Sequence, residues 1–400
     1  MNHPWSGLKN IPRNIWLISV TTLINRTGMM VLPFMALYAV EELEVSAAKA
    51  GLILAFYGIG AFISAPFAGK LSDRLGAINL MRISLISSGI FLIIYSFVTS
   101  FIAFLLLTLI WAVIAEAYRP ASMSFISNEV SADRRKTAFA LNRLAINLGM
   151  SIGPVIGGIL STINFSLLFY VDGFTSVAAG VYLIYSGIKE KRSVDADSEI
   201  AIKDEHSEKK ISILHNRKFI YYMIAIIPVQ IVFFQHIGAL PLFIVEQLAF
   251  SKSTFGFLMA INTVMIILIE VPLNDAMRMW PDWKALMLGA ILTGIGFGIT
   301  IFGFNTHILI FSIVLWTFGE MIFFPSAGNY VAENSPDNMR GEYMGYFQMT
   351  FSFSFMIGPL LGTIVLEEFG ATVVWAGTFI LGMITAAMML NLKSKKVLPE

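Results

Sequence analysis

Twelve apolar runs, each long enough to cross a lipid bilayer, follow one another along this 400-residue chain. A membrane-spanning helix needs roughly 20 mainly apolar residues, because each residue rises about 1.5 Å through a hydrocarbon core about 30 Å thick. None of the runs alternates in the manner of barrel strands, so the sequence predicts an all-α membrane protein with twelve transmembrane helices. The runs lie near residues 14–40, 48–69, 79–98, 101–127, 137–161, 165–187, 218–247, 252–276, 284–303, 306–331, 340–366 and 371–391.

The Lys and Arg residues fall almost entirely on one side of these predicted spans. Of the 27, Arg26 and Arg119 lie within spans and only Lys49 and Lys252 lie in the odd-numbered loops. The other 23 lie in the two termini, the even-numbered loops and the span ends next to them. Because basic loops stay on the cytoplasmic side, we expect a multi-pass protein of the inner (cytoplasmic) membrane with both termini in the cytoplasm.

Composition and motifs exclude several classes of function. The chain has no cysteine, which excludes disulfides, thiolate metal sites and a cysteine nucleophile. The net charge of +1 gives no reason to expect a nucleic-acid partner. No Walker loop, zinc ligand set or serine triad is present. We therefore expect no cofactor, no metal and no enzymatic activity.

One long hydrophilic loop divides the twelve runs into six and six. It is rich in Lys, Glu and Asp. We expect an N-terminal six-helix bundle over residues 1–187, a cytoplasmic linker over 188–217, and a C-terminal six-helix bundle over 218–400.

The two halves match each other at a constant offset of 205 residues. A single offset that holds from the first spans to the fifth indicates duplication of a six-helix unit. Parallel repeats of this kind hold the substrate between the halves in transporters that work by alternating access. The matched pairs are Gly51 and Gly256, Trp111 and Trp316, Pro120 and Pro325, Arg135 and Arg340, Gly153-Pro154 and Gly358-Pro359, and Gly157 and Gly362.

With these features the sequence resembles the major facilitator superfamily over essentially its full length. Gly69, Asp73, Arg74 and Gly76 follow the second run in the order G-x-L-[AS]-D-R-x-G, which is the family's signature between spans two and three. The resemblance implies two pseudo-symmetric six-helix bundles, the major facilitator fold. It also implies that Asp73 accepts from the N-terminal amides of span eleven, which begins near Arg340, and locks the outward-facing state. The alternative is that Asp73 and Arg74 form a solvated loop pair.

Span five carries a second motif, G-x-x-x-G-P-x-x-G-G, which is associated with the proton-coupled drug-antiporter branch of the family. The resemblance implies that this motif seals the cavity on one side, although close packing of small residues would explain it too. Those antiporters usually carry an arginine in the first half of span four, where this chain has the apolar stretch 110–113. The motif consists of Gly149, Gly153, Pro154, Gly157 and Gly158.

Polar and ionisable residues inside the predicted spans are candidate sites, because an intramembrane charge costs several kcal/mol. In the family that this chain resembles, spans one, four, seven and ten line the central cavity. We take the polar residues deep in those spans as candidates for binding substrate and protons. They are Arg26, Glu116, Arg119, Gln235, His236 and Glu320.

The spacing of these candidates suggests different roles. Glu116 and Arg119 stand at i and i+3 and are expected to pair on one helix face, either as a structural pair or with Arg26 as part of a site. Glu320 has no cation on its own span, so burial should favour its protonated form, as suits a proton carrier. The alternative is a neutral Glu320 bonded to a backbone carbonyl. His236 is as often a packing residue as a functional one.

Two more acidic residues lie in spans that do not line the cavity of the family. Glu270, near the end of span eight, is expected to pair with Arg278. Asp172 lies in span six. We interpret both as structural.

The sequence thus predicts a secondary transporter, most simply a proton-coupled antiporter for efflux of drugs or of an amphipathic metabolite. One alternative is an importer or facilitator of a small anionic solute, such as a carboxylate or a siderophore, held by Arg26 and Arg119. Another is a non-transporting membrane sensor. The expected partners are a small-molecule substrate, protons and the lipid bilayer, and we expect a monomer.

Overall fold

The computed structural model describes residues 11–131, 134–188, 216–277, 279–336 and 339–393. Within these ranges every regular element is helical, and twelve spans are long and apolar enough to cross a membrane. The predicted all-α fold with twelve transmembrane helices is therefore confirmed. The expected linker lies almost wholly outside the described residues, and so do the side chains of residues 65, 66, 69, 70, 73, 135, 136 and 340–342.

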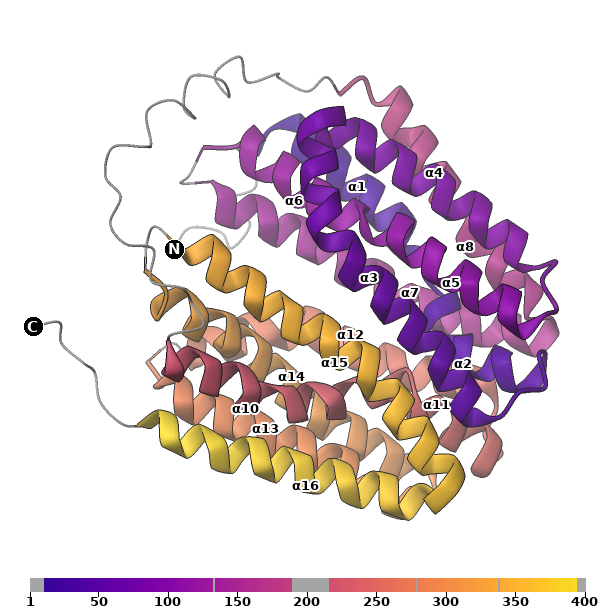
Figure 1. Ribbon diagram of the computed structural model, residues 1–400, viewed down its shortest axis with the longest axis vertical. Coiled ribbons are helices and arrows are strands. Elements are labelled where there is room, and N and C mark those ends of the chain that lie inside the picture. The colour runs from indigo at the N-terminus through magenta and orange to yellow at the C-terminus, as the bar shows by residue number, and fades with distance from the viewer. Residues whose placement is uncertain (1–10, 132–133, 189–215, 278, 337–338, 394–400) are drawn as a thin grey trace, which may run out of the picture.

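The first six spans form one bundle, drawn from indigo to magenta in Figure 1. Its first and fourth spans are each interrupted. The helices are α1 (Arg13–Thr27) with α2 (Val31–Glu41), α3 (Ala47–Leu75), α4 (Ala77–Tyr95), α5 (Phe101–Glu116) with α6 (Tyr118–Glu129), α7 (Arg135–Ile163) and α8 (Ser166–Tyr185).

The last six spans form the second bundle, drawn from salmon to yellow. Its first span is interrupted as well. The helices are α10 (Arg217–Phe233) with the short turns Phe234–His236, α11 (Ala239–Leu242) and Phe243–Gln247, then α12 (Lys252–Ala276), α13 (Asp282–Ile299) with Thr300–Phe302, α14 (Thr306–Glu333), α15 (Arg340–Phe369) and α16 (Ala371–Leu390), followed by the turn Asn391–Lys393.

The duplication read from the sequence reappears in the helix boundaries. The helices α12, α13, α14, α15 and α16 each begin 205 residues after α3, α4, α5, α7 and α8 respectively. Even the caps repeat: Ser46 and Ser251 precede α3 and α12, and each side-chain oxygen accepts from the backbone N–H three residues later. The two pseudo-symmetric six-helix bundles are thereby confirmed.

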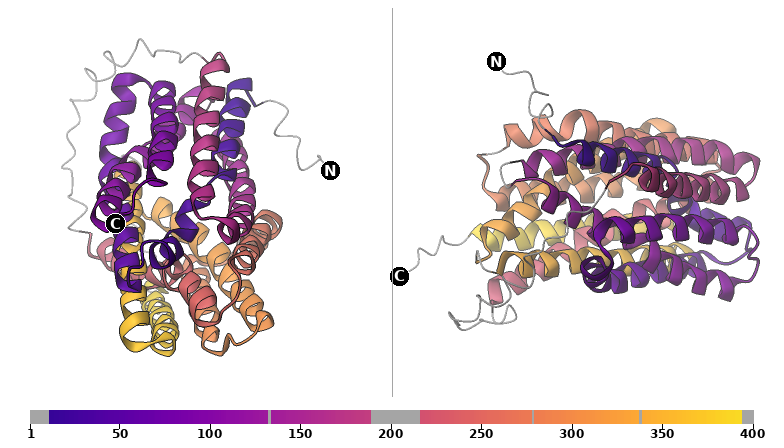
Figure 2. Two further views of the ribbon diagram at one scale, coloured as in Figure 1. Left: turned by 90° about the vertical axis from the view of Figure 1, so that its right-hand side faces the viewer. Right: turned by 90° about the horizontal axis from the view of Figure 1, so that it is seen from above.

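The two bundles share a hydrophobic core cluster at one end only. We call the end where α1 and α10 begin the terminal side, and the end with the odd-numbered loops the opposite side. The core cluster on the opposite side contains residues of both bundles, such as Phe34 and Phe255, whose ring centroids are 5.3 Å apart. The two clusters on the terminal side each belong to a single bundle. In the left view of Figure 2 the indigo-to-magenta helices lie mostly above the salmon-to-yellow helices, and the two groups meet near the middle of the view.

Small residues bring the two bundles into backbone contact along α3 with α15 and α7 with α12. A Cβ atom on Gly51 would lie 1.8 Å from Thr363 Oγ1, and one on Gly256 would lie 2.2 Å from the Pro154 carbonyl oxygen. Larger residues at either glycine would force the helices apart, because packed interiors have no spare volume.

Polar contacts close the opposite side. Lys252 Nζ lies 2.5 Å from Glu41 Oε2 and 4.1 Å from the Phe165 ring centroid. Glu367 accepts a 2.6 Å hydrogen bond from the backbone N–H of Ala48. All these contacts cross from one bundle to the other, so the described conformation is sealed on the opposite side.

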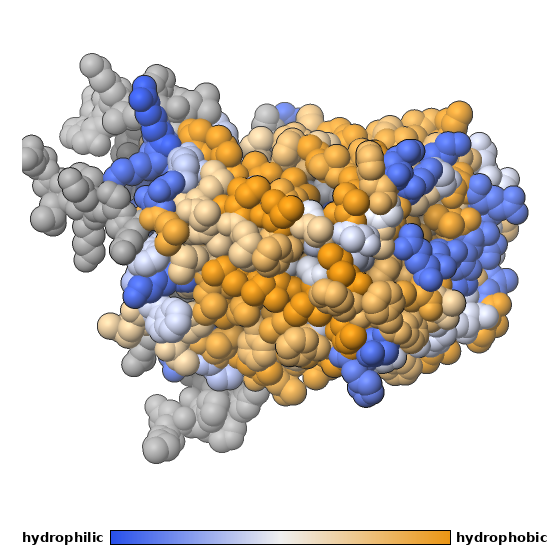
Figure 3. Space-filling model, turned by 90° about the horizontal axis from the view of Figure 1, so that it is seen from below, coloured by the Kyte–Doolittle hydropathy of each residue, from blue (hydrophilic) through white to orange (hydrophobic). Residues whose placement is uncertain are grey.

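The outer surface matches a bilayer. On the face drawn in Figure 3, a broad apolar band lies between polar residues at the two ends of the molecule. Large apolar side chains are exposed on the outer helices, including Phe379 and Ile380 on α16. An apolar band of this extent is stable in contact with lipid and not with water.

Replacing Lys252 by alanine should loosen the seal on the opposite side. The lost ion pair and cation–π contact together contribute about 1 kcal/mol. Their loss should lower the ratio of sealed to unsealed molecules about fivefold. Because the chain lacks cysteine, Thr363→Cys, at a buried contact of Gly51, gives a clean labelling site. Maleimide should label Thr363→Cys faster in the Lys252→Ala background. The control is Lys49→Ala, since Lys49 faces Phe101 within its own bundle. Equal labelling in both backgrounds would contradict the seal.

Candidate functional site

The first span breaks between Thr27 and Val31, in the middle of the membrane. Polar backbone groups at this depth must find partners inside the protein. Asp172 of α8 provides them: its Oδ2 lies 3.3 Å from the backbone N atoms of both Met30 and Val31. The first N–H groups of α2 also favour a negative charge at this position. Asp172 is thus structural, as expected.

The glycine motif of span five packs against this break. Cβ atoms on Gly149 and Gly153 would lie 2.4 Å from Arg26 Cβ and 2.8 Å from the Met29 carbonyl oxygen. On another face of α7, a Cβ on Gly158 would lie 2.7 Å from the Lys252 carbonyl oxygen in the other bundle. One motif therefore fixes the broken span and also forms part of the contact between the bundles.

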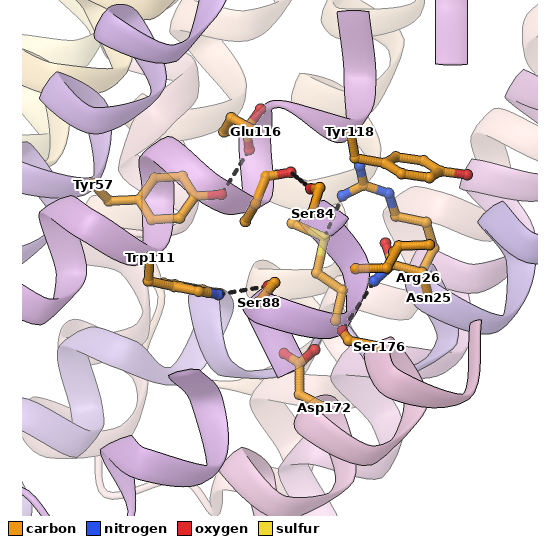
Figure 4. A pocket seen from close by; sticks show the side chains of 13 residues that line it. Asn25, Arg26, Tyr57, Ser84, Ser88, Trp111, Glu116, Tyr118, Asp172 and Ser176 are labelled. Carbon is orange, nitrogen blue, oxygen red and sulfur yellow. Dashed lines mark hydrogen bonds between the residues drawn. The ribbon is translucent and has the colours of Figure 1, made fainter. Parts of the chain in front are cut away.

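A small cavity of about 40 Å³ lies beside the break, within the N-terminal bundle (Figure 4). Its wall includes Arg26 and Glu116, two of the residues that the sequence analysis proposed for a cavity between the halves. It also includes Asp172, contrary to the expectation that span six does not line the cavity; α8 packs on α1, where a Cβ on Gly28 would lie 1.6 Å from Thr175 Oγ1. The lining residues are Asn25, Arg26, Met29, Tyr57, Ser84, Leu85, Ser88, Trp111, Ala115, Glu116, Tyr118, Asp172 and Ser176.

Arg26 is a half-buried cation without a carboxylate partner. Its Nη1 lies 2.8 Å from Met29 Sδ, and its Nε is buried without any hydrogen-bond partner. No carboxylate in the described part of the chain lies within ion-pair distance of Arg26. The guanidinium therefore keeps unused donors in a cavity with open space.

The expected pairing of Glu116 with Arg119 is wrong. Glu116 instead accepts a 2.6 Å hydrogen bond from the Tyr57 hydroxyl. The helix ends at Glu116 and restarts at Tyr118, so the two charged residues do not share one continuous helix face. Arg119 is exposed and does not line the cavity.

Glu320 in the second bundle is held in a comparable way. Its Oε2 accepts from Asn262 Nδ2 at 2.7 Å, and the same nitrogen lies 3.1 Å from Thr317 Oγ1. Asn262 stands 205 residues after Tyr57. Each bundle thus presents one carboxyl on its fourth span to a neutral donor on its second. Sequence reasoning missed both donors, because Tyr57 and Asn262 are neutral and lie in spans two and eight. Their 205-residue separation is the signal that links them.

Gln235 and His236 lie in the break of span seven and bond to the backbone. Gln235 Nε2 donates to the Gly358 carbonyl oxygen at 2.7 Å, and His236 Nδ1 lies 2.6 Å from the Phe233 carbonyl oxygen. Neither residue lines the N-terminal cavity. These contacts favour a role in shaping the broken span.

Glu270 forms an ion pair with Arg143 of α7, across the two bundles. We had assigned Arg278 as its partner, and Arg278 lies outside the described residues. The sequence could not show that α7 and α12 pack side by side.

Comparison with known proteins decides the family. A family model described as the Major Facilitator Superfamily matches residues 16–349 and 236–397. The chain belongs to the Major Facilitator Superfamily. It is therefore a multi-pass membrane transporter and not an enzyme.

Relatives within the superfamily match over most of their length. Tetracycline resistance protein, class B, of Escherichia coli is 22% identical over 371 residues, covering 90% of this chain and 89% of that protein. A Na(+), Li(+), K(+)/H(+) antiporter of Planococcus maritimus is 24% identical over 393 residues, covering 89% and 90%. The crystal structure of a D-xylose-proton symporter aligns with a TM-score of 0.78 at 14% identity, covering 94% of this chain and 96% of that one.

The superfamily's gating motif is only partly described here. Gly69, Asp73 and Arg340 lie in helices, but their side chains are outside the described part of the structure. Arg74 is exposed, and Gly76 joins α3 to α4 with a φ of 86°, which favours glycine. The gate itself stays a prediction.

Asp172→Ala should destabilise this transporter by about 1–2 kcal/mol, because the Val31 N–H loses its acceptor and the Met30 N–H keeps only the Gly28 carbonyl oxygen. Asp172→Asn keeps an oxygen acceptor and should lose less. Thermal unfolding of the detergent-purified variants measures both changes. If the Ala and Asn variants unfold alike, Asp172 does not act as the acceptor for α2.

Proposed function

We propose that this transporter exports small amphipathic molecules in exchange for protons, with Glu320 as the principal proton carrier. Glu320 is half-buried, and its hydrogen-bond donor is the neutral amide of Asn262. A carboxyl held by neutral groups in a low-dielectric site can take up and release a proton without breaking an ion pair. This arrangement is the observation that carries the proposal.

Aromatic rings, beginning with Phe324 one turn after Glu320 on α14, suit an amphipathic substrate. Phe324 lies 4.9 Å from Phe233 and 5.6 Å from Phe351, measured between ring centroids. Phe355 contacts Phe234 at 4.9 Å and Tyr57 of the other bundle at 5.5 Å. Aromatic faces placed between two mobile bundles can bind planar apolar groups of varied shape.

The names of two relatives agree with this proposal. One is a tetracycline resistance protein and the other exchanges cations for protons. Together with the span-five motif they favour efflux by antiport over import, without identifying the substrate.

We further infer that the terminal side faces the cytoplasm, because it carries almost all the Lys and Arg residues. The described conformation would then be open inward and sealed outward. Residues 1–187 and 218–400 would move as two bodies joined by the linker 188–217, within a monomer.

A second candidate function rests on Arg26. An arginine with free donors in a polar cavity suits a carboxylate or phosphate group. This observation favours a second function, the import of a small anionic solute that binds in the N-terminal cavity. A thermal-shift panel of carboxylates and amphipathic cations separates the two candidates, since the true ligand stabilises the folded protein by mass action.

Glu320→Gln mimics the permanently protonated carboxyl and should abolish pH-driven export of ethidium from reconstituted vesicles. Ethidium binding should persist, because Gln keeps the hydrogen-bonding capacity that Asn262 uses. The matched control is Glu333→Gln, at the exposed end of the same helix, which should transport as wild type does. If Glu320→Gln vesicles still respond to a pH gradient, the carrier is Glu116 or His236 instead.

Asp73→Asn should slow transport while leaving expression and fold intact. The charge–dipole contact with span eleven that the family resemblance implies would be worth up to about 2 kcal/mol. Its loss would change the ratio of the two conformations by more than tenfold. Initial transport rates in vesicles report the change. Wild-type rates in Asp73→Asn would show that Asp73 and Arg74 are a solvated pair.

A further inference from the structure

A groove of about 530 Å³ opens on the lipid-facing surface between α4 and α8, at the terminal side. It lies outside the N-terminal cavity and away from the contact between the bundles. Most of its wall is apolar, from Leu75, Ile83, Ile86 and Ile184. One end is polar and is formed by Asn79 and Arg82.

Arg82 is held in place but not neutralised. Its Nη1 donates to Asn79 Oδ1 at 3.3 Å, and its Nη2 donates to the Leu183 carbonyl oxygen at 3.1 Å. Its Nε is buried without a partner. No carboxylate among the described residues lies within ion-pair distance of Arg82. These contacts use only part of the five N–H donors of a guanidinium, so the charge and several donors remain available to an anion.

The depth of Arg82 matches that of lipid headgroups. It lies five residues after the start of α4 at the terminal side, or about 7.5 Å along the helix. Beyond it, toward the membrane centre, Ile83, Ile90 and Ile94 are 51%, 49% and 42% exposed along α4, and Ile184 of α8 is 44% exposed beside the groove. A cation at the interface followed by an apolar surface is complementary to a lipid with an anionic head.

We propose that this groove binds one anionic phospholipid, with its phosphate on Arg82 and its acyl chains along α4. A zwitterionic lipid brings its own ammonium group and gains less from an uncompensated arginine. The inference does not depend on the substrate or on proton coupling, because the groove shares no residue with the cavity or with Glu320.

Native mass spectrometry of the purified protein, titrated with phosphatidylglycerol or with phosphatidylcholine of the same acyl chains, tests the proposal. The wild type should bind phosphatidylglycerol about fivefold more tightly. Arg82→Gln should lose that preference, whereas Arg82→Lys should keep most of it. The matched control is Arg217→Gln, which removes an exposed arginine at the start of α10 and should leave the preference unchanged.

A second variant fills the groove without touching the charge. Ile83→Trp should weaken phosphatidylglycerol binding, and circular dichroism checks that each variant is folded. Glycerol phosphate should not compete, since it lacks the acyl chains. Equal binding of the two lipids by the wild type, or an unchanged preference in folded Arg82→Gln, would overturn the proposal. Competition by glycerol phosphate would show a free-phosphate site instead of a lipid site.

Discussion

A polar backbone group cannot remain unpaired in hydrocarbon, and this requirement governs where three spans of the transporter are broken. The first span is interrupted after Thr27, the fourth after Glu116 and the seventh after Phe233. At the first break Asp172 accepts from the N–H groups of Met30 and Val31, and at the seventh the Gln235 side chain donates to a carbonyl of span eleven. Every candidate residue in these three spans lies within a few residues of a break. The same interruptions that must be satisfied chemically therefore also create the polar sites.

Glycines turn this local constraint into a property of the whole molecule. Those of α7 fit against the first break on one face and against α12 of the other bundle on another. The equivalent glycines of α15, Gly358 and Gly362, fit against the broken seventh span. A movement of either broken span must therefore change the packing between the two bundles. This is the kind of coupling that alternating access requires, because packed interfaces switch between discrete arrangements.

Much of this architecture followed from the sequence, and the exceptions have a common physical cause. Hydrophobic length located the twelve spans, and the 205-residue offset predicted helix starts such as those of α3 and α12. Residue type identified Arg26 and Glu116 as cavity residues. Spacing along one helix failed for Glu116 and Arg119, because a break separates them. Partners from other helices, namely Tyr57, Asn262 and Arg143, depend on which spans are neighbours in the folded bundle, and a single sequence does not contain that information directly.

The central claim is that two bundles, sealed on the opposite side in this conformation, exchange that seal for one on the terminal side. Spin labels can report both sides in one cysteine-free background. One pair, at Arg13 and Lys218, lies on the terminal side, and the other, at Thr99 and Phe304, lies on the opposite side; each pair joins positions 205 residues apart. Electron–electron resonance distances in lipid nanodiscs should change with pH for both pairs, one lengthening as the other shortens. If each spin-label pair shows one distance that does not change with pH, the account is contradicted.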